Sequence, residues 1–130
     1  MVPQKLPKNW NFWNHLLELN TIIDTPCCLL GDFNELEESL DKGGGSPVSP
    51  TQCTKLSLFF HKINASSLAV LDRPFTWKAQ VRGQVLYEKL DRAIVRCDWH
   101  NLYANACITH GPFTCSDHCF LLLMTHNLPA

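Results

Sequence analysis

Two segments of the chain carry apolar residues at the spacing of an amphipathic helix. The first covers residues 9–23, where the apolar positions are Trp10, Trp13, Leu16, Leu17 and Ile23. The second follows Ser49 and Pro50, a pair typical of a helix N-cap and first helical position. Its apolar positions are Leu56, Phe59, Phe60 and Ile63. We therefore expect two helices, each with one face against a core.

Short apolar runs of the kind that form buried strands fill most of the remaining sequence. One run, residues 27–30, ends at Gly31 and stands between the two helical segments. The other runs follow Asn64 and cover residues 68–71, 75–77, 85–87, 90–95, 106–109 and 119–124. A short helix near residues 98–103 interrupts them, and the Gly- and Pro-rich stretch 43–50 is predicted to be a surface loop. The pattern predicts an α+β domain.

Length and composition are those of one globular domain. The chain has 130 residues, of which 45% are hydrophobic and 18% charged, and its formal net charge is −1 at pH 7. This balance excludes a low-complexity linker and a strongly basic nucleic-acid coat. We expect the domain to cover residues 9–124, with an N-terminal extension (1–8) and a C-terminal tail (125–130).

The N-terminal sequence and the cysteines bear on the compartment of the protein. The first residues include prolines and lysines but no apolar signal region, and no apolar run is long enough to span a membrane. The seven cysteines are an odd number and form no CxxC pair, so a disulfide framework is not expected. We therefore expect an intracellular protein that is not secreted.

The first candidate for chemistry is the tetrapeptide Gly31-Asp32-Phe33-Asn34, which follows a predicted buried strand. If the segment stays extended, the side chains of Asp32 and Asn34 face the same side. Aspartate can bind a divalent cation or activate water, and asparagine can donate to a phosphate oxygen. A simple turn is the alternative interpretation, since both residue types favour turns.

Asp91, Asp117 and His118 are the other candidates. Asp91 lies inside an apolar strand run, where a half-buried carboxylate needs a partner. That partner is either Arg92 or Lys89, in a structural ion pair, or a histidine that Asp91 orients. Asp117 and His118 precede the last apolar run, where one can face a metal ion and the other a phosphate. Alternatively, the histidine is merely exposed in a loop.

The order of these motifs resembles the C-terminal half of an exonuclease–endonuclease–phosphatase domain, which has the DNase I-like fold. The motifs are GDFN (31–34), FTW (75–77), LDRA (90–93) and SDH (116–118). Together with Lys42-Gly43-Gly44 and Asp98-Trp99, they are most similar to the endonuclease of LINE-type (non-LTR) retrotransposons. The resemblance implies a DNase I-like four-layer α/β sandwich, represented here by about its C-terminal half.

The resemblance also implies a metal-dependent nuclease site. Asp32 and Asn34 would activate the attacking water and stabilise the transition state, and Asp91 would orient His118. Asp117 would belong to the metal and nucleophile environment, with Mg²⁺ as the cofactor. The implied reaction is the nicking of DNA to give the 3′-hydroxyl that primes reverse transcription. A nuclear location and a reverse transcriptase domain in a parent polyprotein follow from the same resemblance.

One departure from the family pattern bears on activity. In the family, the first half of the domain supplies a metal-binding glutamate, and this sequence corresponds to the second half. Glu35, Glu37 and Glu38 do not stand where that glutamate would. We therefore expect a fragment of a Mg²⁺-dependent endonuclease that is inactive as an isolated chain. Its strands are expected to form one sheet, which packs on a second sheet in the complete fold.

Residues 78–84 are predicted to form a hairpin loop that carries two positive charges, Lys78 and Arg82. The resemblance implies that this hairpin lies beside the site and reaches a DNA groove. A solvated turn without a binding role is the alternative.

Two other functions stay open at this stage. A small zinc-binding interaction module would use Cys107, His110, Cys115, His118 and Cys119, although their spacing matches no paired-ligand knuckle. Other members of the superfamily, such as abasic-site nucleases and phosphoinositide phosphatases, share the GDxN and SDH motifs, and a shared fold cannot choose among them.

Overall fold

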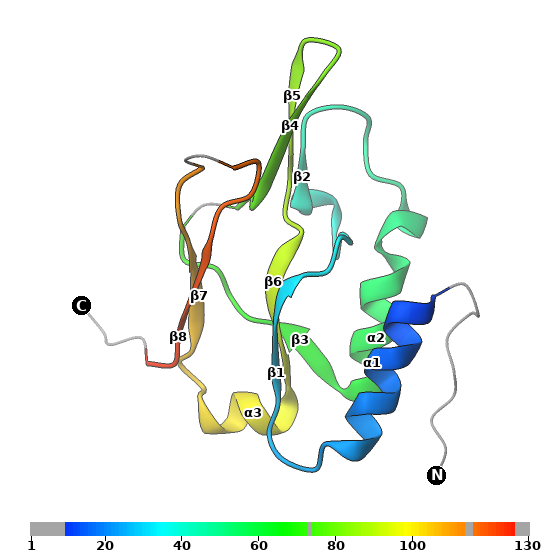
Figure 1. Cartoon of the computed structure of the whole chain (residues 1–130), viewed down its shortest axis with the longest axis vertical. Helices are drawn as coiled ribbons and strands as arrows, with labels where there is room; N and C mark the ends of the chain where they lie inside the picture. The colour runs from blue at the N-terminus through cyan, green and yellow to red at the C-terminus, as the bar shows by residue number, and fades with distance from the viewer. Residues whose placement is uncertain (1–9, 73, 114–115, 127–130) are drawn as a thin grey trace.

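A computed structural model of the chain describes residues 10–72, 74–113 and 116–126. The elements in chain order are α1 (Asn11–Ile22), β1 (Cys28–Asp32), the 3-10 turn η1 (Ser39–Asp41), β2 (Lys42–Gly43), the 3-10 turn η2 (Pro50–Cys53), α2 (Thr54–Ile63), β3 (Ala65–Ser67), β4 (Trp77–Val81), β5 (Gln84–Glu88), β6 (Asp91–Arg96), α3 (Cys97–Leu102), β7 (Cys107–His110) and β8 (Leu121–Met124). Helices and antiparallel sheets are mixed, which confirms the α+β class (Figure 1). No helix among these residues is long and apolar enough to cross a membrane.

The strands form three small sheets, so the expected single sheet is wrong. Their orders are β1–β6–β3, β2–β5–β4 and β7–β8. Between the first two sheets, the hydroxyl of Thr76 accepts the backbone N–H groups of Leu90 and Asp91 in place of a strand partner, which interrupts the ladder. Isolated bridges join Trp77 of β4 to His118 and Ile108 of β7 to Val70, two residues that lie outside the strands.

Helices α1 and α2 cover one face of the β1–β6–β3 sheet (Figure 1). Trp13 of α1 packs on Phe33 and Phe59, with ring centroids 6.0 and 5.0 Å apart. Both helices were predicted, but α2 begins at Thr54 and not at the expected Pro50. Ser49 precedes a 3-10 turn that starts at Pro50, and its backbone N–H donates to the Gln52 side chain at 2.7 Å.

The other face of this sheet packs against α3 and the β7–β8 hairpin through Val95, Trp99 and Ile108. The predicted strand 68–71 is wrong, and the preceding residues form β3 instead. Segment 68–71 crosses between sheets: the N–H of Leu68 donates to β6, whereas the N–H of Leu71 donates to Ile108 of β7. Because the segment changes partner within a few residues, it belongs to neither ladder.

Strands β4 and β5 form a hairpin that projects beyond the rest of the molecule (Figure 1). Its turn consists of Arg82 and Gly83, both with positive φ, as the tight turns of two-residue hairpins require. Most of the predicted loop 78–84 is therefore strand. At its base, β2 pairs with β5, and a Cβ atom at Gly43 would lie 2.9 Å from the Phe75 ring, so only glycine allows this approach.

Candidate functional site

Asp91 and His118 form the centre of the site. His118 Nδ1 lies 2.8 Å from Asp91 Oδ2, and on the other side of the ring His118 Nε2 lies 3.8 Å from Asp32 Oδ2. The Asp91 side chain is 13% exposed and that of His118 is 32% exposed, so the pair sits at the edge of the core. Asp91 therefore pairs with the histidine, which rules out the expected alternative of an ion pair with Arg92.

Thr76 holds the two halves of this pair together. It is fully buried, and its hydroxyl accepts the backbone N–H groups of Leu90 and Asp91 at 2.9 and 3.0 Å. Its carbonyl accepts the N–H of Cys119 at 2.9 Å, next to His118 in the chain. A single buried residue thus fixes the backbone on both sides of the hydrogen bond between Asp91 and His118.

Asp32 lies at the end of β1, and Asn34 lies in a turn that follows it. The backbone N–H of Asn34 donates to Asp32 Oδ1 at 2.8 Å, and Asn34 has a left-handed φ of 53°. The segment therefore does not stay extended. An extended backbone was the expected reason for the Asp32 and Asn34 side chains to face the same side, and that expectation is wrong. The turn nevertheless leaves Asp32 Oδ2 directed toward His118.

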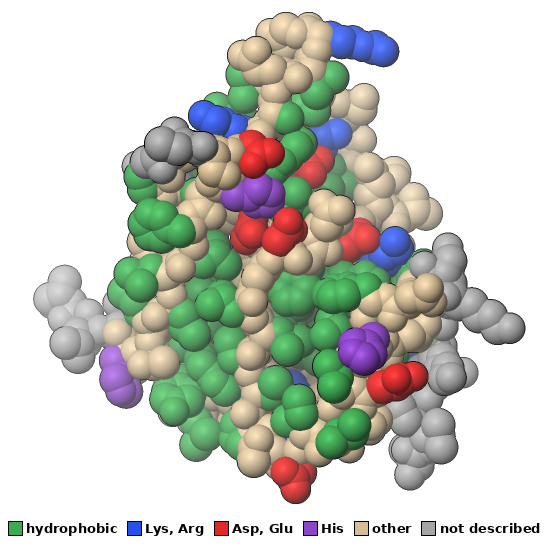
Figure 2. All heavy atoms as spheres, in the orientation of Figure 1, with side chains coloured by type: hydrophobic (Ala, Val, Ile, Leu, Met, Phe, Trp, Pro, Cys, Tyr) green, Lys and Arg blue, Asp and Glu red, His purple; other side chains and the backbone are tan. Residues whose placement is uncertain are grey.

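The surrounding charges favour the protonated form of His118. Burial by itself lowers the pKa of this imidazole, but its hydrogen bond to Asp91 and the negative charges of Asp91, Asp32 and Asp117 outweigh that effect. The pKa of His118 consequently lies above its ordinary value of 6.5. Figure 2 shows acidic side chains gathered around a histidine below the hairpin.

Arg92 fixes the loop that follows Asn34. Its side chain is 1% exposed, and it makes ion pairs with Glu37 and Asp41 at 3.1 and 3.3 Å. The same guanidinium donates to the carbonyls of Glu35 and Lys89. The loop between β1 and β2 is therefore held by a buried cation, whereas Glu35 forms a separate ion pair with Lys55 at 3.2 Å.

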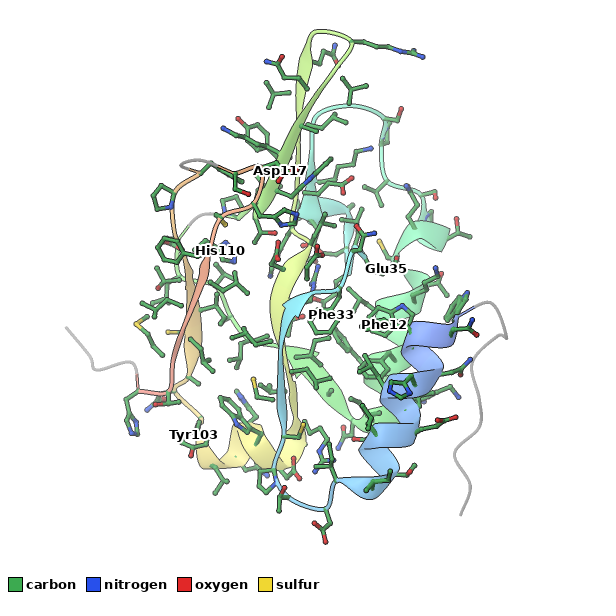
Figure 3. All side chains as sticks on the ribbon, viewed as in Figure 1. Phe12, Phe33, Glu35, Tyr103, His110 and Asp117 are labelled. Atoms are coloured by element: carbon green, nitrogen blue, oxygen red, sulfur yellow. The ribbon has the colours of Figure 1, made fainter. Side chains whose placement is uncertain are left out.

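Asp117 and Lys78 lie at the base of the hairpin, beside this centre, and Arg82 lies at the hairpin turn. The N–H of Lys78 donates to the Asp117 carbonyl at 2.9 Å, and Figure 3 shows Asp117 at the base of the hairpin. Lys78 Nζ lies 5.0 Å from the centre of the Phe113 ring, whereas Arg82 stands at the hairpin turn. Lys78 is therefore close to the candidate site, and Arg82 is at the far end of the hairpin.

Within the described residues, one group of side chains could hold a metal ion: Asp32, Asp91 and His118, with ligand atoms within 4.8 Å of one another. Two carboxylates and one imidazole suit a divalent cation, but they leave Mg²⁺ dependent on waters or further ligands. Asp117, the predicted metal residue, is not in this group. The cysteines of the alternative zinc module are not in it either, and Cys115 lies outside the described residues.

Comparisons of the chain with protein-family models, with curated proteins and with solved structures each found no match. The resemblance to the exonuclease–endonuclease–phosphatase superfamily stays a prediction. Of the five predicted catalytic residues, the structure brings Asp32, Asp91 and His118 into one cluster. Sequence reasoning assigned no role to Thr76, and it considered Arg92 only as a partner of Asp91, whereas Arg92 pairs with Glu37 and Asp41.

Proposed function

We propose that this chain supplies the histidine–aspartate half of a Mg²⁺-dependent phosphodiesterase site, from a DNA endonuclease of the retrotransposon type with a DNase I-like fold. The observation that carries the proposal is the pair of contacts made by His118, 2.8 Å to Asp91 and 3.8 Å to Asp32. A histidine between two carboxylates brings three chemical groups together. The carboxylates can act as a base and as cation ligands, and the histidine can act as a charged hydrogen-bond donor.

Each residue has a role that follows from its contacts. Asp91 accepts a hydrogen bond from the Nδ1–H group of His118, which leaves the other ring nitrogen to face the substrate as a charged donor. A positive imidazolium stabilises the negative charge that develops on the phosphate. Asp32 is the more exposed carboxylate, with a side chain 44% exposed, and is placed to take the proton of the attacking water. Attack of that water on phosphorus breaks the P–O3′ bond, and the 3′ oxygen leaves as a hydroxyl after taking up a proton.

The cofactor would be Mg²⁺, held by Asp32 and Asp91 with a contribution from Asp117. When bound, the ion supplies positive charge to the phosphate oxygens. Mg²⁺ binds weakly to one or two carboxylates, and the described residues near this cluster offer no further glutamate ligand. For this reason, we propose that the chain expressed alone does not nick DNA, and that a family N-terminal half completes the ligand set.

The proposed partner is DNA, contacted by Lys78 at the site and by Arg82 at the hairpin turn. The two-residue turn keeps this hairpin narrow, so it can enter a groove while its base stays beside His118. A nuclear location and a reverse transcriptase domain in the same polyprotein belong to this proposal, since nicking would supply the primer for that enzyme.

A supercoiled-plasmid assay tests the function. The chain alone with Mg²⁺ is expected to leave the plasmid supercoiled. Addition of the N-terminal half of a retrotransposon endonuclease is expected to give nicked circles, and His118→Ala is expected to abolish this activity. The control is His100→Ala, an exposed histidine of α3 away from the cluster. Nicking that survives His118→Ala, or no nicking by a folded complemented protein, would contradict the proposal.

A further inference from the structure

The loop that joins β2 to α2 contains two Ser-Pro dipeptides that the proposed function does not use. They are Ser46-Pro47 and Ser49-Pro50. All four residues are exposed, and the loop arches away from β2 before it reaches α2 (Figure 1). A serine followed by proline in an exposed loop is the motif that proline-directed protein kinases recognise, and these enzymes bind the substrate segment in an extended form.

The two serine hydroxyls differ in their contacts. Ser49 Oγ lies 3.0 Å from Thr51 Oγ1 and 3.3 Å from Gln52 Oε1, and the Ser49 N–H donates to the same Gln52 oxygen at 2.7 Å. These contacts belong to the 3-10 turn that leads into α2. Within the part of the chain that the structure describes, the Ser46 hydroxyl has no hydrogen-bond partner. Ser46 is therefore the serine whose hydroxyl is available for reaction.

The backbone at Ser46 can also adopt the form that a kinase binds. The proline that follows disfavours a helical conformation at this serine, and residues 47–49 belong to no helix or strand. The Ser46 carbonyl accepts an exposed hydrogen bond from Lys42 Nζ at 2.8 Å, and such a contact costs little to exchange for water. Ser49, by contrast, enters an extended site only if its turn opens.

We propose that Ser46 is phosphorylated by a proline-directed protein kinase and that Lys42 binds the phosphate. In this transfer, Ser46 Oγ attacks the γ-phosphorus of ATP, and the bond from that phosphorus to the bridging oxygen of ADP breaks. The hydroxyl proton passes to a carboxylate of the kinase, and ADP leaves. The modification involves no nucleic acid, so it is independent of the nuclease proposal.

The surroundings of Ser46 suit a phosphate group. A depression of about 290 Å³ lies at this loop, and its lining includes Lys42, Gly44 and Gly45 beside Ser46. The two glycines have no side chains, so phosphate oxygens can approach the backbone here. Lys42 stands opposite Glu88 in the ladder, and a phosphoserine, with about −1.5 to −2 charges at pH 7, attracts the ammonium more strongly than that carboxylate does.

Kinase treatment of the full chain tests the site. The folded chain is incubated with ATP and a cyclin-dependent kinase, and mass spectrometry of its peptides measures phosphate at each serine. Phosphorylation at Ser46 is expected to be about tenfold faster than at Ser49, because the turn that holds Ser49 must open first. In a synthetic peptide of residues 40–54, which α2 no longer supports, the two rates are expected to be similar.

Variants assign the two roles. Pro47→Ala is expected to abolish phosphorylation at Ser46, whereas the matched control Pro50→Ala is expected to leave it unchanged. Phosphorus NMR of the modified chain is expected to show a lower second pKa of the phosphoserine in the wild type than in Lys42→Met, because the ammonium favours the dianion. Lys62→Met, on α2, is the control for this pKa and is expected not to change it.

Each part of the proposal has an outcome that overturns it. The site is wrong if the folded chain takes up no phosphate at Ser46, or if the modification survives Pro47→Ala. A ratio of Ser46 to Ser49 phosphorylation no larger in the folded chain than in the peptide also overturns the selection of Ser46 by the structure. An equal phosphoserine pKa in the wild type and in Lys42→Met overturns the role of Lys42.

Discussion

The two sides of the candidate site are built in different ways. On one side, Asp91 and His118 are fixed by Thr76, a fully buried residue that bonds the backbone of both segments. On the other side, Asp32 is 44% exposed and is followed by a turn whose only described internal bond joins the Asn34 N–H to Asp32. Buried Arg92 fixes the loop beyond that turn through ion pairs with Glu37 and Asp41.

This difference indicates which residues determine the positions of Asp91, His118 and Asp32. The aspartate–histidine pair depends on neutral hydrogen bonds inside the core, so its geometry and the stability of the fold are coupled. The Asp32 side depends on the buried cation of Arg92, so we expect a large loss of stability when Arg92 is replaced and a small one when an exposed residue such as Asn34 is replaced. The following predictions test this contrast, beginning with the largest expected effect.

Replacement of Arg92 with methionine is expected to have the largest effect on stability. It removes the ion-pair partner of Asp41, whose side chain is 5% exposed, and leaves that carboxylate buried without its salt bridge. Breaking a buried pair in this way costs about 3–5 kcal/mol of unfolding free energy. Urea unfolding measures it, with Arg82→Met at the exposed hairpin turn as the control. A loss no larger than that of the control would show that Arg92 does not hold the loop.

Thr76→Val is expected to cost about 2–3 kcal/mol, because it leaves two buried backbone N–H groups without an acceptor while it keeps the volume of the side chain. The same urea experiment applies. Thr109→Val, a half-buried position in β7, is the matched control and is expected to change stability by less than about 0.5 kcal/mol. Equal effects of the two substitutions would show that the Thr76 hydroxyl is not what connects the segments.

On the exposed side, Asn34→Ala is expected to destabilise the chain by about 1 kcal/mol more than Asn34→Gly. Alanine resists the left-handed conformation at φ 53°, whereas glycine adopts it freely. Both variants keep the backbone N–H that donates to Asp32. Thermal melts compare the pair, and the reverse order of stability would mean that this turn is not maintained in solution.

The smallest predicted effect concerns the hairpin and DNA. Changing Lys78 and Arg82 to alanine is expected to lower the slope of log affinity against log salt concentration by about one for each lost phosphate contact. Lys62→Ala, on α2, is expected to leave the slope unchanged. An unchanged slope in the double variant would make the hairpin a solvated turn without a binding role.

The sequence predicted the elements of the fold better than their connections. Apolar spacing predicted both long helices, whereas Ser49-Pro50 starts a 3-10 turn that leads into the second. Segment 68–71 could not be predicted correctly, because its backbone bonds first to β6 and then to β7 and so continues neither ladder. At the junction between β5 and β6, the backbone bonds to the hydroxyl of Thr76, and no periodicity reveals this contact.

The candidate site was predictable in part. Asp32, Asp91 and His118 were singled out from their motifs, and the structure brings them together. The choice between Arg92 and His118 as the partner of Asp91 depended on tertiary contacts, because Arg92 reaches Glu37 and Asp41 in a loop far away in sequence.

The pKa of His118 tests the central claim most directly, namely that Asp91 positions and charges this histidine. NMR titration in metal-free buffer is expected to give a pKa above the ordinary 6.5 in the wild type and a lower value in Asp91→Asn. Since folding raises this pKa, the stability that the pair contributes is fully present below the unfolded value and is lost as pH rises through the folded value. Asp91→Asn should therefore destabilise the chain most at low pH. A wild-type pKa at or below 6.5, unchanged by Asp91→Asn, would contradict the account.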